Sequence, residues 1–214
     1  MKRTPDEIFA DLYKAFPALK SCETEIRAAY GLLLTCAVRG ATVLLCGNGG
    51  SAADCEHIAG ELMKGFLLRR PLSHAERLRF ARLPGGDAIA EKLQGAIRAI
   101  SLVSQSGLIS AFANDVDPTL VFAQQVYAYA QQPQDVLIAL TTGGNSANVV
   151  NAAVAAKACG IGVIAITGEA GGNIAPLADA AIRLPTAETY RVQEYTLPVY
   201  HALCAAVEAA IFDR

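Results

Sequence analysis

A series of short, mostly apolar runs constrains the fold most. The runs are Ala41–Cys46, Ile100–Val103, Asp135–Leu140, Gly162–Thr167 and Ala180–Leu184. The first shows no alternation of apolar and polar residues, which is typical of a strand buried on both faces. Segments with helical patterns lie between the runs. We therefore expect a parallel sheet covered by helices on both sides.

Apolar residues recur at helical spacing in the segments around these runs. Helices are predicted from Ile8 to Leu19 and over Ile26–Val38, Val121–Ala130, Ser146–Ala158 and Thr189–Phe212. Gly40 and Gly160 are typical helix ends. Pro198 lies inside the last helix and is expected to kink it between Gln193 and His201.

The composition indicates one globular domain and excludes several classes of partner. The chain has 214 residues, of which 53% are hydrophobic, and a net charge of −2 without blocks of like charge. We therefore expect no nucleic-acid partner and no membrane association. No uninterrupted apolar stretch reaches about 18 residues, and the amino terminus lacks the apolar core of a signal peptide. A cytoplasmic location is expected, with the six cysteines as buried thiols rather than disulfides.

The segment Lys64–Gly95 interrupts the alternation of strands and helices. It holds two prolines, a Gly85-Gly86 pair and five arginines: Arg69, Arg70, Arg77, Arg79 and Arg82. A connection of this length is usually functional or disordered. Two hypotheses remain, a solvated excursion and a basic lid over an anionic ligand; Ser73–Phe80 has helical potential. No linker divides the chain, so residues 1–214 are predicted as one domain with this insertion at about 64–95.

Two glycine-rich loops follow predicted strands and open predicted helices. They are Cys46–Ser51 and Leu140–Ser146. Glycines allow the backbone to approach a ligand closely, and the N–H groups of a helix start favour an anion. Neither loop matches the dinucleotide or nucleoside-triphosphate motif. The hydroxyls of Ser51, Thr141, Thr142 and Ser146 add donors, so an anion site is predicted at the carboxyl ends of the strands.

A third polar strand end is expected at Ala113–Asp115, after the apolar run Leu108–Phe112. The alternative is a turn stabilised by an Asn or Asp side chain.

Two histidines, a glutamate and a glutamine form a further candidate site. His57 and Glu61 are four residues apart and share a helix face. This spacing permits metal binding or an acid–base pair, and it also occurs in ordinary surface pairs. Gln193 and His201 are eight residues apart on the last helix, where His201 has apolar neighbours and could be a core residue. If all four converge, their nitrogen and oxygen ligands suit zinc.

Five stretches resemble the sugar isomerase (SIS) domain family, and within it the phosphoheptose isomerase branch. They read CGNGGSAADCEHIAGEL, AFANDVDPTLVFAQQV, TTGGNSANVV, AITGEAGGNIAPLAD and YRVQEYTLPVYHALCAAVE. The resemblance implies a three-layer sandwich with a five-stranded parallel sheet, flavodoxin-like, with long terminal helices. It also implies a homotetramer with active sites at subunit interfaces.

The resemblance further implies roles for individual residues. Glu61 and His201 would be the catalytic acid–base pair, and zinc would be bound by His57, Glu61, Gln193 and His201. The substrate would contact Asn48, Gly49, Gly50, Glu61, Asn114, Asp115, Thr141, Thr142, Gly143, Ser146 and Gln193, and the loop chemistry adds Ser51. Thr141 and Gly143 replace serines that are usual in the family, so one side-chain donor to the phosphate is lost.

The implied reaction is the conversion of sedoheptulose 7-phosphate to D-glycero-D-manno-heptose 7-phosphate through an enediol. Isomerisation of another sugar phosphate is one alternative. The other is a non-catalytic SIS protein that binds the bacterial replication initiator. That relative lacks the acidic residue at the position of Glu61, so the presence of Glu61 favours an enzyme.

Overall fold

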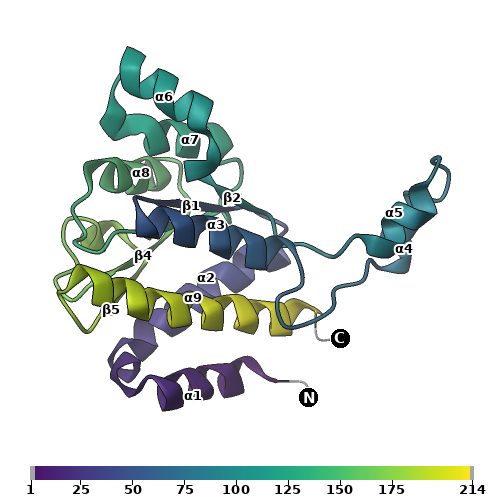
Figure 1. Cartoon of the computed structure of the whole chain (residues 1–214), viewed down its shortest axis with the longest axis horizontal. Helices are drawn as coiled ribbons and strands as arrows, with labels where there is room; N and C mark the ends of the chain where they lie inside the picture. The colour runs from purple at the N-terminus through teal and green to yellow at the C-terminus, as the bar shows by residue number, and fades with distance from the viewer. Residues whose placement is uncertain (1–2, 213–214) are drawn as a thin grey trace.

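The computed structural model describes residues 3–212 and contains a five-stranded parallel sheet. The strands are β1 (Val43–Gly47), β2 (Ala99–Ser101), β3 (Val136–Leu140), β4 (Gly162–Gly168) and β5 (Ala180–Leu184). They lie in the order β2-β1-β3-β4-β5 (Figure 1). This is the flavodoxin-like order, in which β1 and β3 are neighbours, β2 lies beyond β1, and β4 and β5 lie beyond β3. Every residue of β1 and β3 is buried, as the apolar runs predicted.

Nine α-helices are described within residues 3–212. They are α1 (Pro5–Ala15), α2 (Glu23–Val38), α3 (Gly50–Met63), α4 (His74–Leu78), α5 (Gly86–Lys92), α6 (Ser106–Asp115), α7 (Val121–Tyr129), α8 (Ala147–Ala158) and α9 (Thr189–Phe212). Short 3-10 turns occur at Pro17–Cys22, Leu102–Ser104, Pro118–Leu120 and Ala175–Leu177.

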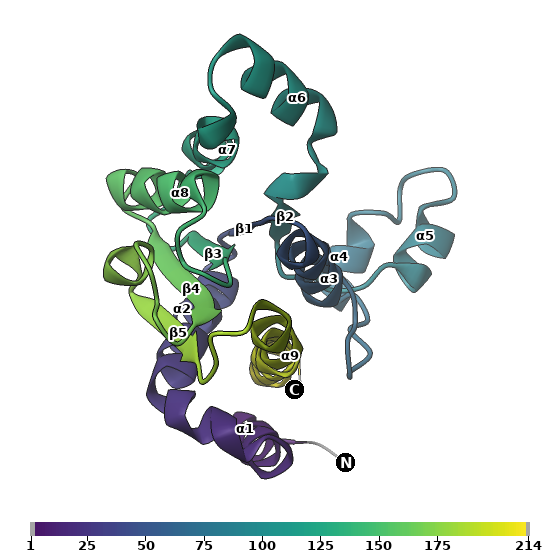
Figure 2. The ribbon, with the colours of Figure 1, turned by 60° about the vertical axis from the view of Figure 1, so that its left-hand side comes forward.

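Successive strand residues point to opposite faces of the sheet and fill two cores. On one face, Val43 and Leu45 of β1 pack with residues of α1, α2, α3 and α9. On the other face, Leu44 and Cys46 pack with residues of α7 and α8. Figure 2 shows the sheet between these two sets of helices. The predicted fold class, a three-layer α/β sandwich with long terminal helices, is confirmed.

The last helix, α9, is a core helix. It runs from Thr189 to Phe212 across Pro198 without interruption and contacts α1, α2 and α3. By length and mean hydropathy alone it could cross a membrane, but 56% of its most apolar window is buried inside the protein. A helix in the middle of an α/β core passes the same test of length and composition. The apolar character of α9 is therefore explained by packing.

Several predicted elements differ in the structure for identifiable reasons. The expected first helix ends at Ala15, because Phe16 precedes Pro17 and a residue before proline avoids the helical conformation. The expected second strand shortens to Ala99–Ser101 and continues as a 3-10 turn. The run that was expected to form a strand before Asn114 is part of helix α6. A short apolar run alone does not distinguish a strand from a helix.

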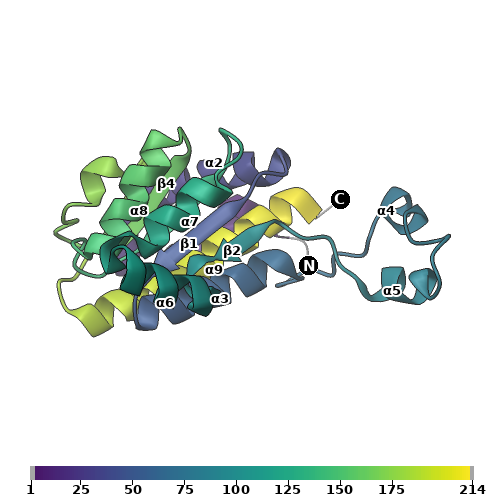
Figure 3. The same cartoon turned by 90° about the horizontal axis from the view of Figure 1, so that it is seen from above.

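The insertion forms an arm, defined here as residues 71–94, which carries α4 and α5. The arm extends away from the body beyond the end of α3 (Figures 1 and 3). Its neck is closed by a bridge between Pro71 and Gln94 and by a 2.7 Å hydrogen bond from the Gly95 N–H to the Arg70 carbonyl. The predicted helix at Ser73–Phe80 is shorter, at His74–Leu78. The arm lies between the end of α3 and the start of β2, so it emerges at the amino edge of the parallel sheet.

Candidate active site

The first glycine loop connects β1 to α3 at the carboxyl edge of the sheet. Gly49 has a φ of 55°, a conformation that side chains rarely adopt, and α3 begins at the next residue. A Cβ on Gly47 would lie 2.9 Å from the Ser51 carbonyl oxygen, so the loop is tight as well as turned. Ser51 is buried in the first turn of α3. The loop therefore brings Asn48, Gly50 and Ser51 to the positive end of a helix.

The second glycine loop connects β3 to α8 and places two hydroxyls together. The Thr141 and Ser146 hydroxyl oxygens are 3.2 Å apart at the start of α8. Gly144 has a φ of 71°, and a Cβ there would meet the Gly171 carbonyl oxygen at 2.3 Å. The turn is thus packed against the loop that follows β4. Thr142 and Gly143 lie within this turn, next to the hydroxyl pair.

The two glycine loops are joined by a reciprocal pair of amides. Asn48 Nδ2 donates to Asn148 Oδ1, and Asn148 Nδ2 donates to Asn48 Oδ1, each at 2.9 Å. Two helix amino ends with hydroxyl and amide donors therefore meet at one edge of the sheet. This is an arrangement that binds phosphate. Asn148 was not predicted as a site residue, because no motif distinguishes it from other polar residues in the first turn of a helix.

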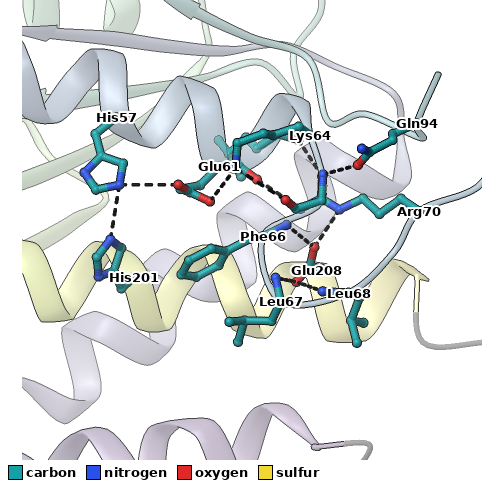
Figure 4. Close-up of polar contacts among 12 residues, drawn as sticks. His57, Glu61, Lys64, Phe66, Leu67, Leu68, Arg70, Gln94, His201 and Glu208 are labelled. Carbon is teal, nitrogen blue, oxygen red and sulfur yellow. Dashed lines mark hydrogen bonds and ion pairs between the residues drawn. The ribbon is translucent and has the colours of Figure 1, made fainter. Parts of the chain in front are cut away.

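His57, Glu61 and His201 meet where α3 and α9 lie side by side (Figure 4). His57 Nε2 is 3.3 Å from Glu61 Oε1 and 3.5 Å from His201 Nε2. The Glu61 side chain is only 12% exposed, and the His57 ring is 43% exposed. A partly buried carboxylate with two imidazoles is an arrangement that can move protons to and from a bound ligand.

A tyrosine and an aspartate support the ring of His57 from behind. The Tyr200 hydroxyl lies 2.9 Å from His57 Nδ1 and donates to Asp54 Oδ1 at 3.2 Å. Burial raises the pKa of Asp54, although the Tyr200 hydrogen bond and His57 oppose this; burial and Asp54 raise the pKa of Tyr200. Neither residue was predicted. Asp54 precedes His57 by three residues, so helical spacing alone could have suggested it.

The surroundings of His201 favour its neutral form. Burial, reinforced by the nearby His57, lowers the pKa of His201, while Glu61 partly offsets the effect. The ring of Phe66 covers His201, with ring centroids 5.4 Å apart. A neutral imidazole offers both a proton donor and an acceptor, which an imidazolium does not.

Lys64 provides a cation at the other side of Glu61. Its ammonium lies 3.2 Å from Glu61 Oε2, while Glu61 Oε1 faces His57. Both carboxylate oxygens of Glu61 therefore have a polar neighbour. The sequence indicates no role for Lys64, because nothing in its spacing distinguishes it from a solvated lysine.

The predicted zinc ligands are brought together only in part. His57 contacts both Glu61 and His201, and their nitrogen and oxygen atoms are chemically suited to zinc. Gln193 instead lies against Gly50 at the start of α3, where a Cβ would be 2.6 Å from its Nε2. Over residues 3–212, no three His, Cys, Asp or Glu side chains are already arranged to hold a metal ion. Within the described residues, no hydrogen bond joins Gln193 to His57, Glu61 or His201.

Asn114 and Asp115 lie on a helix rather than at the end of a strand. They end α6, where Asn114 Nδ2 donates to Asp115 Oδ1 at 2.8 Å. The expectation that they follow a strand was wrong, because Ile109, Phe112 and Ala113 are spaced to pack one face of a helix on the α7–α8 core. Within residues 3–212, no hydrogen bond joins Asn114 or Asp115 to the glycine loops or to His57.

Comparison with known families gives a consistent result. The model of the SIS domain family matches residues 11–104 and 85–168. The phosphoheptose isomerase of Rhodospirillum rubrum is 37% identical and covers 92% of this chain and 91% of its own length. That of Shewanella denitrificans is 31% identical and covers 100% of this chain and 98% of its own length.

Solved structures show the same relationship. A phosphoheptose isomerase from Neisseria gonorrhoeae superposes with a TM-score of 0.68 at 30% identity, over 94% of this chain and 98% of that one. One from Francisella tularensis superposes with a TM-score of 0.71 at 25% identity, over 94% of this chain and 96% of that one. The resemblance noted in the sequence is confirmed, and the chain belongs to the SIS domain family, in the branch of the phosphoheptose isomerases.

Proposed function

We propose that this chain is an aldose–ketose isomerase that converts sedoheptulose 7-phosphate to D-glycero-D-manno-heptose 7-phosphate through an enediol. The observation that carries the proposal is the combination of two sites in one chain. A pair of glycine loops offers donors to a phosphate, and Glu61 lies between His57 and Lys64 on the helix that one of these loops opens. The named relatives supply the identity of the substrate.

The phosphate would be held by the glycine loops. The hydroxyls of Ser51, Thr141 and Ser146 and the free N–H groups at the starts of α3 and α8 would surround it. Asn48, Gly49, Gly50, Thr142 and Gly143 would contribute close backbone approach and amide contacts. An anchored phosphate fixes the sugar chain so that the reacting carbons stay in one place during proton transfer.

Glu61 and His201 would divide the proton transfers between carbon and oxygen. Glu61, as its carboxylate, would take a proton from C1 of the ketose, and neutral His201 would donate a proton to the C2 oxygen, giving the enediol. Glu61 would then return its proton to C2 while His201 removes the proton from the C1 oxygen, giving the aldose. Each group ends in its starting state, as a catalyst must.

Zinc is the proposed cofactor, held by His57, Glu61 and His201 with Gln193 as the fourth ligand. When bound, such an ion polarises a carbonyl oxygen as a Lewis acid. The support is the donor set itself. His57 Nε2 lies 3.3 Å from Glu61 Oε1 and 3.5 Å from His201 Nε2, and carboxylate oxygen and imidazole nitrogen atoms are ligands that zinc accepts.

A homotetramer in the cytoplasm is proposed on the family resemblance. An apolar groove of about 610 Å³ between α1 and α9 supports association between copies of the chain. Its lining includes Ile8, Leu12, Phe66, Leu197 and His201. Because His201 lies on this groove, a neighbouring copy would help to enclose the candidate acid–base pair.

The proposal is tested by incubating the purified chain, metal-free and zinc-loaded, with sedoheptulose 7-phosphate and measuring aldose formation. Glu61→Gln should abolish turnover, because the amide cannot accept a proton from carbon. Glu56→Gln, an exposed position on the same helix, is the matched control and should retain activity. Turnover of a different sugar phosphate would support the first alternative. No turnover, together with specific binding to a replication initiator, would support the second alternative, a non-catalytic protein.

A further inference from the structure

An arginine and a glutamate form a fully buried ion pair beside the candidate acid–base residues. Arg70 Nε donates to Glu208 Oε1 at 2.7 Å, and the two side chains are 0% and 1% exposed. Arg70 is the only arginine of the insertion that is buried. Figure 4 shows the pair next to the end of α3, with Glu61 between the pair and His57.

Glu208 binds the backbone of the turn at residues 66–68. Its two carboxylate oxygens accept from three consecutive N–H groups, those of Phe66, Leu67 and Leu68, at 2.7–3.1 Å. With Arg70 this makes four charge-assisted hydrogen bonds to one carboxylate, so all of its strong acceptor sites are used. The turn that follows Lys64 is therefore fixed to α9.

Arg70 caps the helix that carries Glu61. Its two terminal nitrogens donate to the carbonyls of Leu62, at 2.7 Å, and Glu61, at 3.0 Å. The last carbonyls of a helix have no partner inside it and carry its negative end, so a guanidinium there satisfies both needs. The planar fork of Arg70 reaches Glu208 and two carbonyls at once, which an ammonium could not do.

Stability alone does not explain such a pair. Removing two ions from water is costly, and well-packed apolar residues of the same volume often give an equally stable protein. The pair instead links three parts of the chain: the end of α3, the turn 66–68, and α9 at a position seven residues beyond His201. A spacing of seven places Glu208 on the same face of α9 as His201.

We propose that Arg70 and Glu208 are positioning residues for the Glu61–His201 pair. They fix the register between α3 and α9, and they fix the turn that places Lys64 on Glu61 and Phe66 on His201. This inference rests on the proposed function, in which Glu61 and His201 act on one substrate. Neither Arg70 nor Glu208 touches the substrate in this proposal, because their polar atoms are used within the protein.

Two single variants and one double variant test the proposal. Arg70→Lys and Glu208→Gln should lower kcat by about 100-fold, the loss typical of a 1 Å displacement of catalytic groups, while KM changes little because the phosphate loops lie at the other end of α3. The double variant Arg70→Met/Glu208→Leu removes both charges and should recover the thermal stability that the single variants lose. Its kcat should stay low. Arg69→Met, an exposed neighbour, should change neither quantity.

The outcomes separate positioning from a merely structural role. A double variant with wild-type kcat and wild-type stability would overturn the proposal. So would single variants whose activity falls only in proportion to the unfolded fraction. Histidine ring NMR gives a second readout, with His74 on the arm as internal reference. If the wild-type chain does not turn over the heptulose phosphate, only the proposed function fails. The ring signals of His57 and His201 then still test the positioning. Displaced signals in the double variant support it, and unchanged signals refute it.

Discussion

The Tyr200 hydroxyl lies 2.9 Å from His57 Nδ1 and donates its proton to Asp54. Because the hydroxyl has only one proton, it accepts from the Nδ1–H of His57. The lone pair of His57 Nε2 then points toward Glu61 and His201. Outer partners of this kind set the tautomer and the orientation of a metal-binding imidazole.

We expect Tyr200→Phe to weaken zinc binding by at least about tenfold, since the loss of an outer hydrogen-bond partner commonly has this effect. The measurement is a competition titration of zinc against a chromophoric chelator. Tyr127→Phe, at a tyrosine that is 73% exposed, is the control. Equal zinc affinity of both variants and the wild type would show that Tyr200 does not orient His57 toward a metal.

The contact between Gly50 and Gln193 gives a second prediction. A methyl group at position 50 would lie 2.6 Å from Gln193 Nε2, the far end of a flexible side chain. Gly50→Ala should therefore displace Gln193 at little cost in stability and raise the KM for the sugar phosphate several-fold. Steady-state kinetics and thermal unfolding measure the two effects.

Two other glycines of the same region serve as comparisons for Gly50→Ala. Gly60→Ala, in α3 with nothing within 4 Å of the added methyl, should leave KM unchanged and stabilise the helix by up to about 1 kcal/mol. Gly47→Ala meets the backbone of Ser51 and should destabilise the fold. An unchanged KM in Gly50→Ala would remove Gln193 from the substrate site.

Much of the fold could be predicted because strands buried on both faces are visible in the sequence. Ala41–Cys46 and Asp135–Leu140 became β1 and β3 within two residues at each end, and the glycine loops after them lie where expected. The segment Leu108–Phe112 could not be assigned, since its apolar residues suit either a strand or one face of a helix. Tertiary packing on α7 decides in favour of the helix.

The candidate site was predictable only where two of its residues lie one helical turn apart on the same helix. His57 and Glu61 are one helical turn apart, so their proximity follows from α3 alone. The partners of these residues come from α9, and the sequence of neither helix determines their register relative to each other. Arg70 illustrates the difficulty further. It is one of five arginines in a polar insertion, yet it alone is buried, because Glu208 lies 138 residues away in the chain and next to it in space.

The cysteines should differ sharply in reactivity. Burial raises the pKa of Cys36 and of Cys204 to about 12, and it also raises the pKa of Cys46 and Cys55. Since only the thiolate attacks an alkylating reagent, these thiols should resist iodoacetamide at neutral pH. Cys159 is the one half-exposed cysteine and should be alkylated first. Mass spectrometry of the folded chain checks this order, and rapid labelling of Cys46 or Cys55 without denaturant would contradict the packing of the sheet.

An ion pair just before the start of β5 predicts a loss of stability in acid. Burial would raise the pKa of Asp179, but hydrogen bonds from Lys157 at 2.7 Å and from the Val163 N–H at 2.8 Å outweigh this and hold it below the ordinary value. The folded state therefore favours the carboxylate. Its stabilising contribution is present above the ordinary pKa of an aspartate and is lost as the pH falls through the lowered value.

Asp179→Asn should lose this contribution, which is at most about 1 kcal/mol because both side chains are partly exposed. Urea unfolding near pH 7 and again near pH 3 measures it, and the difference between variant and wild type should shrink at the lower pH. Asp87→Asn, on the exposed arm, should behave as wild type at both values. A constant difference across this range would show that the hydrogen bonds, and not the charge, matter.

The position of the arm favours a solvated excursion over a lid on the phosphate site of the same chain. The glycine loops lie at the carboxyl edge of the sheet, whereas the arm leaves at the amino edge, beyond the 14-residue helix α3. At a rise of 1.5 Å per residue the two ends of α3 are about 20 Å apart. Helices of five and seven residues are too short to be stable alone, and only Gly86 and Ala90 of the arm are buried.

We therefore expect trypsin to cut the folded chain first within the arm, at Arg77, Arg79 or Arg82, at a rate that a sugar phosphate does not change. Replacing residues 72–93 by a short glycine–serine linker should leave thermal stability and KM close to wild type, because the neck contacts of Arg70 with Gly95 and with Glu208 remain. Gel analysis of timed digests, with and without the ligand, gives the first result, and steady-state kinetics of the linker variant gives the second. Protection of the three arginines by the ligand, combined with a raised KM in the linker variant, would establish the arm as a lid instead.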